Sequence, residues 1–384
     1  MSFANSLRDQ FLLDPSIIYL NHGSFGATPR SVFEKYQAFQ LELEREPVEF
    51  LGRRFNDLMR AAREPLAAYL HVAADEIVYV SNATTGLNVV ARSLDLKPGD
   101  EILSTNHEYG ALDRTWRFLC GKAGATYINH QLPDPLESRE QFIESMWSRV
   151  TDRTRVIFLS HITSPTALLF PVEEICQRAR SAGILTMIDG AHAPGQIDLD
   201  LQSIGSDFYS GTCHKWMCAP KGSGFLYARK DKQHLVEPLI VSWGYESDNP
   251  SGSKFIDHHE WLGTRDYAAY LATPSAIEFM AQHDWPKVQS QCRILAREAQ
   301  RLITEWSGRT VLNLDSYPHD LQMLTASLPP CDPVSTQGKL FAEYHIEIPF
   351  VAWDNRQWIR VSIQAYNSAN DVDRLLIALR DILK

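Results

Sequence analysis

The alternation of short β-rich runs with helical runs constrains the fold of this chain more than any other feature. From about residue 75 to residue 190, apolar runs are followed by segments of helical periodicity, as in EIVYVSN then TTGLNVVARSL, and RVIFLSH then VEEICQRARSAG. Strands that alternate with helices form βαβ units, and their strands lie parallel in a sheet that is buried on both faces. The sequence therefore predicts an α/β fold with a mainly parallel sheet sandwiched by helices.

The pattern changes on both sides of this region. Residues 30–70 read as helical, with an apolar stripe that includes Phe55, Met59 and Leu66, and we expect these residues in the core. The stretch WGYESDNPSGSKF at 243–255 is typical of a long loop, and longer helices with a few short strands follow it. Because 384 residues exceed one typical core, we predict a large domain of residues 15–255 and a smaller α+β domain of residues 1–14 and 256–384.

Charge and hydropathy exclude several classes of partner. The chain has 37 Lys and Arg against 47 Asp and Glu, and a net negative charge opposes binding to nucleic acid and to anionic lipid. No stretch approaches the ~20 apolar residues that a membrane span needs, and the N-terminus lacks the apolar core of a signal peptide. The six Cys residues are scattered, as expected for reduced thiols. We predict a cytoplasmic protein without nucleic-acid or membrane partners.

Polar residues at strand ends are the candidates for chemistry, because ligands of parallel α/β sheets bind at the carboxyl ends of the strands. The run ILTMID ends at Asp189, and His192 follows it. Lys215 lies further on among small, aromatic and apolar neighbours, where burial lowers the pKa of the amine and lets it form a Schiff base with a carbonyl. Taken singly, Asp189 could be a turn residue and Lys215 a surface lysine that packs on Trp216.

The loop Ser81-Asn82-Ala83-Thr84-Thr85-Gly86 lies between a predicted strand and a well-marked helix. Its backbone N–H groups and two Thr hydroxyls suit a phosphate at a helix N-terminus, although Thr is also an ordinary N-cap residue. The loop matches neither GxGxxG nor GxxxxGK[ST], which disfavours dinucleotides and nucleoside triphosphates. An anion site, an amine and a carboxylate that can keep a pyridine nitrogen protonated together indicate pyridoxal 5′-phosphate (PLP).

The motifs YLNHGSFGATP, SNATTGLN, HEYGALDRTW, SHITSPTA, IDGAHAPG and IRVSIQAYN occur in this order along nearly the whole chain. In this respect the sequence resembles the class V aminotransferase family of fold type I PLP enzymes, and within it the isopenicillin N epimerase-like branch. The resemblance implies a mainly parallel seven-stranded sheet, a smaller α+β C-terminal domain, PLP as cofactor, an amino acid substrate, and a homodimer with shared active sites.

The resemblance also implies roles for the residues that match the family motifs. Lys215 would bind PLP covalently, Asp189 would pair with the pyridine nitrogen, and Tyr109 would stack on the ring where many relatives have a His. His192, Thr163 and Ser164 would lie near the phenolic oxygen. The residues implied to hold the phosphate are Ala83, Thr84, Thr85, Thr212 and His214, with Thr264 contributed across the dimer interface. Those implied to bind substrate are Arg360, which takes the carboxylate, and Asn21 and His22 at the mouth.

The sequence leaves the reaction open. Lys215 would remove the Cα proton in an epimerase or racemase, with Tyr109 or His22 as the donor on the opposite face, and the same residues serve a cysteine or cystine Cβ–S lyase or an aminotransferase. The segment YHIEIPFVAWDNRQWIR lacks the nucleophilic Cys of family cysteine desulfurases. A PLP-binding scaffold without turnover is disfavoured because Lys215, Asp189 and Arg360 occur together.

Two further expectations concern side chains outside these motifs. Aromatic residues around Trp243, Tyr245, Phe350 and Trp353 either shape the substrate pocket or belong to the core. We predict no metal, because the adjacent His258-His259-Glu260 would point to opposite faces of a strand.

Overall fold

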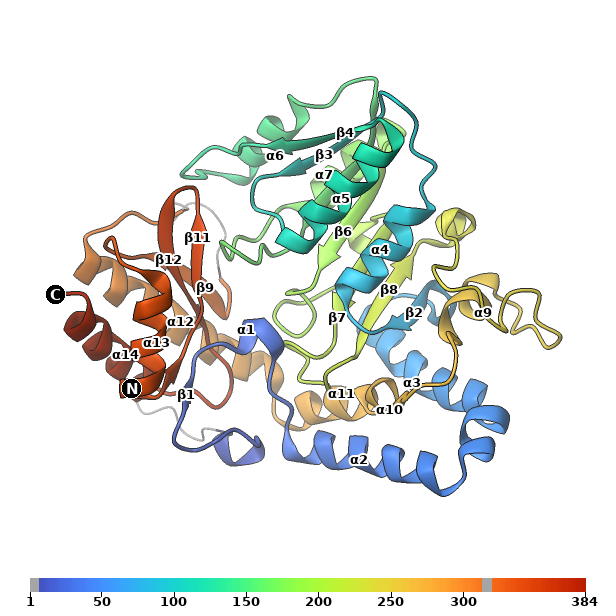
Figure 1. Ribbon diagram of the computed structural model, residues 1–384, viewed down its shortest axis with the longest axis horizontal. Helices are drawn as coiled ribbons and strands as arrows, with labels where there is room; N and C mark the ends of the chain where they lie inside the picture. Colours follow the sequence, from blue (N-terminus) through green and yellow to red (C-terminus); the bar gives the residue numbers. More distant parts are fainter. Residues whose placement is uncertain (1–6, 313–319) are drawn as a thin grey trace.

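A seven-stranded sheet forms the centre of the computed structural model, which describes residues 7–312 and 320–384 (Figure 1). All pairs in this sheet are parallel except those of β8, which runs antiparallel to both neighbours. The predicted α/β fold with a mainly parallel sheet is confirmed. In spatial order the strands are β2 (Ile77–Val80), β8 (Gly224–Ala228), β7 (Phe208–Thr212), β6 (Leu185–Gly190), β5 (Thr154–Ser160), β3 (Glu101–Thr105) and β4 (Thr126–His130).

Both faces of this sheet are buried, as the unbroken apolar runs predict. Side chains alternate between faces along a strand, so Val78 and Val80 of β2 join one apolar cluster while Ile77 and Tyr79 join another. Helices α4 (Ala83–Ser93) and α5 (Gly110–Ala123) cover the first face (Figure 1). The second face packs against α3 (Phe55–Tyr69) and α7 (Val172–Ser181), and α6 (Arg139–Trp147) and α8 (Leu201–Ile204) complete this part.

The helical region before the sheet is divided into two helices joined by a short turn. It consists of α2 (Arg30–Arg45), a π-helical turn (Glu49–Arg53) and α3, and the apolar stripe of α3 is buried at Phe55, Met59 and Leu66. Helices α9 (Lys254–Glu260), α10 (Ala268–Leu271) and α11 (Thr273–Gln282) follow the long loop, and α10 and α11 pack against α2 and α3. The predicted strand at His258-His259-Glu260 is wrong: these residues lie in α9, where Glu260 pairs with buried Arg63.

The C-terminal part has its own antiparallel sheet. Its strands are β11 (Phe350–Trp353), β12 (Arg356–Ser362) and β9 (Met323–Ser327), and the helices around it are α12 (Trp285–Ser307), α13 (Pro333–Tyr344) and α14 (Ala369–Ile382) (Figure 1). Near the N-terminus β1 (Ile18–Tyr19) pairs with β10 (Ile346–Glu347), and the short helix α1 (His22–Phe25) then leads toward the large sheet. The division of the chain at residue 255 stays a prediction.

Candidate active site

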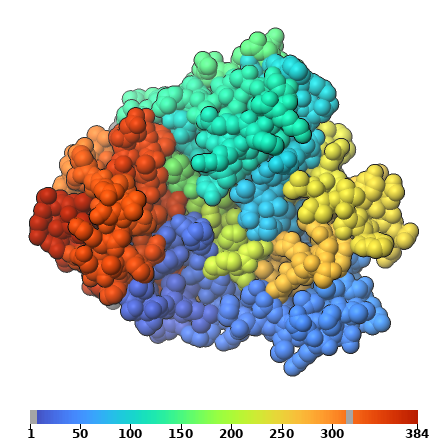
Figure 2. Space-filling view, viewed as in Figure 1, coloured from blue at the N-terminus to red at the C-terminus, as the bar shows by residue number. Residues whose placement is uncertain are grey.

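A cavity of about 580 Å³ opens at the carboxyl ends of β5, β6 and β7. It is lined by strand-end residues and by the N-termini of α4 and α5, the edge at which a parallel sheet gathers polar groups. The predicted site residues on its walls are Ala83, Thr84, Thr85, Tyr109, Ser164, Asp189, His192, Thr212, His214 and Lys215. In the space-filling view the blue N-terminal segment lies between the red C-terminal part and the rest of the chain (Figure 2), and its residues Ser24 and Phe25 complete the wall.

Lys215 follows β7 and places its amine inside this cavity. Its Nζ lies 3.2 Å from Nε2 of His192. Burial, and after it the charge of Arg360, lowers the Lys215 pKa to about 8, with Asp189 acting in the opposite direction. Relative to the ordinary value of 10.5, the fraction of free amine at neutral pH rises roughly 300-fold, so Lys215 is suited to nucleophilic attack on an aldehyde.

The loop that carries Lys215 is held from below by α1. His22 contacts the Lys215 carbonyl through Nε2 at 2.9 Å and the Tyr366 hydroxyl through Nδ1 at 2.9 Å. Gly26, at φ +69°, lies so close that a Cβ there would be 2.1 Å from the His214 carbonyl oxygen, which only glycine tolerates. The prediction that His22 lines the substrate mouth is therefore corrected: its ring is buried beneath the Lys215 loop with both nitrogens occupied.

Asp189 ends β6 at the base of the cavity. Burial raises the pKa of its carboxyl, although the Ala191 N–H at 2.9 Å and the charge of Lys215 favour the ionised form. In the described part of the chain this carboxylate is in no ion pair within 4 Å. A buried carboxylate without a cation is costly, and a cationic group of a ligand at the base of the cavity would offset this cost.

The N-terminus of α4 offers an anion site smaller than predicted. Asn82 caps the helix by accepting from the Thr85 N–H at 2.9 Å, and the Thr85 hydroxyl contacts Ser81 at 2.9 Å. The predicted role of Thr85 is corrected in this respect: its backbone N–H already has a partner, because an N-cap side chain satisfies one of the helix's free donors. The N–H groups of Ala83 and Thr84 remain for a phosphate.

His214 and Thr212 face this helix end across the cavity. The Thr212 hydroxyl donates to the Ala191 carbonyl at 2.6 Å. His214 Nδ1 lies 2.7 Å from the Ser223 carbonyl, which can only accept, so this nitrogen carries a proton. Burial lowers the His214 pKa to about 4, and Nε2 can therefore donate to an anion only after a further proton is taken up.

Arg360 on β12 of the C-terminal sheet is not among the residues that line the cavity, but it contacts Ser164 and Ser24, which are. Its side chain donates to the Ser164 carbonyl at 2.6 Å, the Ser164 hydroxyl at 3.1 Å and the Ser24 hydroxyl at 3.0 Å. No carboxylate among the described residues pairs with it, and its Nε is buried without a partner. Burial lowers its pKa to about 10, so the group stays charged and is only 5% exposed.

Ser24 is a site residue that the sequence did not single out, although the motif NHGSFG contains it. Its hydroxyl accepts from Arg360 and donates to Asn21 Oδ1 at 2.5 Å, and Asn21 donates to Glu347 at 3.0 Å. Asn21, predicted at the substrate mouth, thus supports Ser24 from behind and is not among the residues that line the cavity.

Two other predicted residues lie away from the cavity. The hydroxyl of Thr163 is buried, contacts Thr166 at 2.7 Å and accepts from the Leu168 N–H at 2.8 Å, and Thr163 is not among the residues that line the cavity. Its place near the phenolic oxygen stays a prediction. Thr264 is exposed and lies outside the cavity wall. Its role in a second subunit's site stays a prediction.

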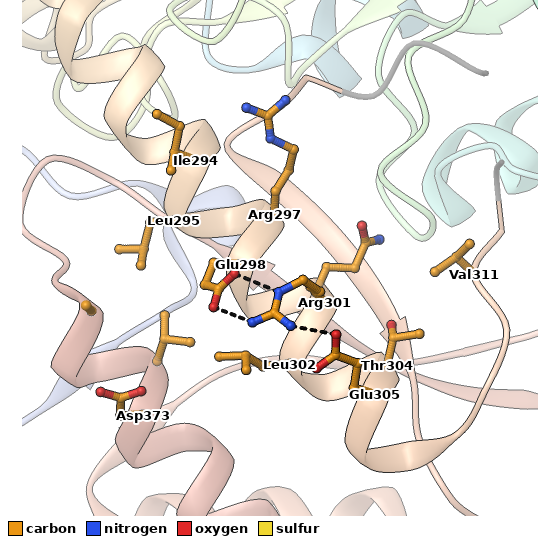
Figure 3. A pocket seen from close by; sticks show the side chains of 13 residues that line it. Ile294, Leu295, Arg297, Glu298, Arg301, Leu302, Thr304, Glu305, Val311 and Asp373 are labelled. Carbon is orange, nitrogen blue, oxygen red and sulfur yellow. Dashed lines mark hydrogen bonds and ion pairs between the residues drawn. The ribbon is translucent and has the colours of Figure 1, made fainter. Parts of the chain in front are cut away.

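A larger groove of about 800 Å³ lies between α12 and α14. In Figure 3, Arg301 of α12 forms ion pairs with Glu298 and Glu305 on its own helix. None of the predicted site residues lines this groove. The predicted site residues gather at the strand ends instead, so the smaller cavity there is the candidate active site.

None of the helices in 7–312 and 320–384 has the length and hydropathy of a membrane span. In the same ranges, no three His, Cys, Asp or Glu side chains gather as metal ligands would. The absence of a metal in the working protein stays a prediction.

The chain is similar to known proteins in sequence and in fold. The family model described as aminotransferase class-V matches residues 18–375. Isopenicillin N epimerase of Streptomyces clavuligerus is 36% identical over 97% of this chain and 96% of its own length, and a probable chloroplastic L-cysteine desulfhydrase of Arabidopsis thaliana is 26% identical over 97% and 84%. The structure of a C-DES mutant with glycine covalently linked to PLP has a TM-score of 0.86 at 22% identity, and covers 97% of this chain and 99% of that one.

Proposed function

Because the chain belongs to the class V aminotransferase family, we propose that it epimerises or racemises the Cα of an amino acid. Its cofactor is PLP, which when bound acts as an electron sink and stabilises negative charge at the substrate Cα. In this proposal Asp189 holds the pyridine nitrogen, Ala83, Thr84 and His214 hold the phosphate, and Lys215 supplies the amine. The buried Asp189 carboxylate without a cation fits this cofactor.

The observation that carries the proposal is the unpaired charge of Arg360. A buried guanidinium normally has an acidic partner, and here three neutral oxygen contacts hold it. The charge of this group also lowers the pKa of Lys215, so the two side chains serve one site. An α-carboxylate is the anion whose planar geometry matches a guanidinium, and an amino acid bound there presents its Cα to Lys215.

Epimerisation needs a proton acceptor on one face of Cα and a donor on the other. We assign the first role to Lys215. Tyr109 is the candidate for the second, because it lines the cavity and is 45% exposed, whereas both ring nitrogens of His22 are occupied. The 36% identity to an isopenicillin N epimerase over nearly the full length supports this reaction over the alternative.

The alternative is β-elimination from cysteine or cystine. The similarity to an L-cysteine desulfhydrase supports it, and the same Lys215 would take the Cα proton while a thiolate leaves from Cβ. Residues 344–360 contain no Cys. This segment therefore has no thiolate that could accept sulfur as a persulfide, which disfavours a cysteine desulfurase.

We further propose a cytoplasmic homodimer with shared sites. The apolar side chains of Leu239, Ile240, Val241 and Trp243 are exposed on one segment, with Trp243 at 82%, and a second copy of the chain would remove such a strip from water. Thr264 is also exposed and free to reach a neighbouring subunit. All six Cys residues are free thiols, as in a reducing compartment.

The test is incubation of the PLP-loaded protein with a panel of L-amino acids in deuterated water, followed by chiral analysis and mass spectrometry. Deuterium at Cα together with the D-isomer supports the proposal. Pyruvate and sulfide from cysteine would establish the lyase instead, and amino-group transfer to a keto acid would establish an aminotransferase. Lys215→Ala is the control, and turnover that survived in it would contradict the role of Lys215.

A further inference from the structure

Both ring nitrogens of His192 contact a side chain of the Lys215 loop. The Nε2 atom of His192 lies 3.2 Å from the Lys215 amine, and its Nδ1 lies 3.3 Å from Nε1 of Trp216. Trp216 follows Lys215 directly in the chain, and its indole is fully buried. One loop therefore supplies both the amine and a group that contacts the opposite edge of the imidazole.

The chemistry of these groups determines where the His192 proton lies. An indole N–H can only donate, so Nδ1 must be the acceptor in this contact. Burial, followed by the charges of Lys215 and Arg360, lowers the His192 pKa well below its ordinary value, and the ring is neutral. A neutral imidazole carries one proton, which must then be on Nε2 and directed at the Lys215 amine.

The indole is held so that this contact persists. Its ring centroid lies 5.1 Å from that of His22, and Gly23 of α1 lies close to the indole, since a Cβ there would be 3.3 Å from Cζ2 of Trp216. In a close-packed interior a side chain of this size cannot turn without displacing its neighbours.

We propose that Trp216 is a positioning residue that fixes the tautomer of His192, so that the Nε2 proton faces Lys215 and the reacting end of the cofactor site. A donor at this place favours the free amine, because an ammonium group has only N–H donors and would oppose it. The role in catalysis rests on the proposed function, whereas the tautomer itself does not.

Among the described residues, the other charged groups around Lys215 make no hydrogen bond with Trp216. Asp189 on β6 raises the Lys215 pKa and Arg360 on β12 lowers it, and Lys215 in turn lowers the pKa of neighbouring His214. Tyr109, across the cavity, interacts with Arg360. A shift of the Lys215 titration in a Trp216 variant therefore reports on His192.

The first experiment observes the tautomer in the apoenzyme by multiple-bond proton–nitrogen NMR of histidine-labelled protein, with His192→Gln to assign the signal. The expected result is the pattern of a neutral ring protonated on Nε2. A ring protonated on Nδ1, or an imidazolium at neutral pH, would overturn the proposal. Because the measurement needs neither cofactor nor substrate, it stands even if the protein turns over no amino acid.

The second experiment measures Lys215 in the apoenzyme by reductive methylation with formaldehyde across a pH series, read by peptide mass spectrometry. Trp216→Phe removes the donor, the His192 proton can move to Nδ1, and Nε2 then accepts from the Lys215 ammonium. We expect the Lys215 titration to move up by about one unit, which slows methylation roughly tenfold below its midpoint. An unchanged midpoint would contradict the proposal.

Two further proteins separate the hydrogen bond from packing. Trp216→β-(3-benzothienyl)alanine keeps the shape of the indole but has no N–H, so it should reproduce the shift even if Trp216→Phe fails to fold. Trp116→Phe is the matched control, because Trp116 is equally buried and its Nε1 has no partner among the described residues. If the midpoint of the Lys215 titration also shifted in this control, the loss of any buried tryptophan would be enough to cause the shift, and the inference would be overturned.

Discussion

At the scale of single residues, the site depends on charges that are buried without opposite charges. Arg360 is surrounded by the neutral oxygens of Ser164 and Ser24, and the Asp189 carboxylate accepts, among the residues that the structure describes, only the N–H of Ala191. Leaving a buried ion unpaired costs stability. A bound ligand that carries both a carboxylate and a cationic ring nitrogen removes both costs, and this coupling is the physical reason to expect an amino acid and PLP in the same cavity.

Replacing Arg360 should weaken substrate binding more than it affects folding. In Arg360→Lys the forked pair of N–H donors is lost, and we expect KM for the amino acid to rise about 10- to 100-fold, the effect of one charge-assisted hydrogen bond. Steady-state kinetics measure it. Arg356→Lys on the same strand is the control, because Arg356 pairs with Asp134 and Asp354 near the surface. An equal rise in KM in the control would contradict the assignment.

Anion binding at His214 should depend on pH. The His214 pKa is about 4 in the free site because of burial, and an anion on Nε2 raises it, so binding takes up a proton. Affinity of the apoenzyme for sulfate should therefore fall as pH rises, by up to about tenfold per unit between pH 5 and 7. Isothermal titration calorimetry in buffers of different ionisation enthalpy counts the protons. His214→Gln, whose amide donates without titrating, should lose most of this slope, and an undiminished slope would exclude His214 as the group.

At the scale of elements, the phosphate site requires α4 to lie very close to the sheet. Gly86 permits this approach: a Cβ on it would be 2.3 Å from Ser210 Oγ and 3.3 Å from Leu226 Cβ. The helix N-terminus, with the N–H groups of Ala83 and Thr84, is thereby brought to the carboxyl end of β7, where Thr212 is the last residue of the strand and Lys215 follows it.

Gly86→Ala should displace α4 and with it the anion site. We expect a loss of about 1–3 kcal/mol in the free energy of unfolding from overpacking, together with weaker PLP binding, measured by denaturant titration and by fluorescence of the cofactor. Gly121→Ala is the control, since this glycine lies in α5 and no atom is within 4 Å of its added Cβ. The control should be neutral or slightly stabilising. Equal losses in both variants would show that the loss at Gly86 does not come from its close contacts with Ser210 and Leu226.

At the scale of the whole molecule, the active site is assembled from both sheets. The large sheet supplies Asp189 and the Lys215 loop, the C-terminal sheet supplies Arg360, and the N-terminal segment that pairs with β10 supplies Ser24 between them. Relative movement of these parts would change the distance between Arg360 and the Lys215 amine, while the local surroundings of each side chain stayed the same.

The proposed homodimer with shared sites makes a prediction for mixed subunits. Lys215→Ala removes the amine of one site, and Thr264→Glu places a negative charge beside the phosphate of the neighbouring site. Each variant alone should be inactive. After random mixing, half of the dimers are mixed and each has one intact site, so about one quarter of the activity should return. Light scattering establishes the dimer first, and a dimer that recovers no activity would contradict shared sites.

Much of the site could be predicted from the sequence because its central residues are tied to local patterns. The periodicity of strands and helices placed Asp189, Lys215 and the loop at 83–85 at strand ends, and parallel strands bring such ends to one edge. The edge strand β4 was not singled out, because a half-exposed strand lacks the apolar run that marks buried ones.

The direction of each side chain was decided only by the tertiary structure. His22 and Thr163 belong to the right segments but turn toward Tyr366 and Leu168, and Ser24 and Trp216 reach Arg360 and His192 through contacts between segments distant in the chain. Periodicity along a chain determines which residues meet at the same edge of a sheet. Which atoms then face the cavity depends on how segments pack against one another, whether their residues are near in the chain, as Thr163 and Leu168 are, or far apart, as Ser24 and Arg360 are. Periodicity does not carry that information.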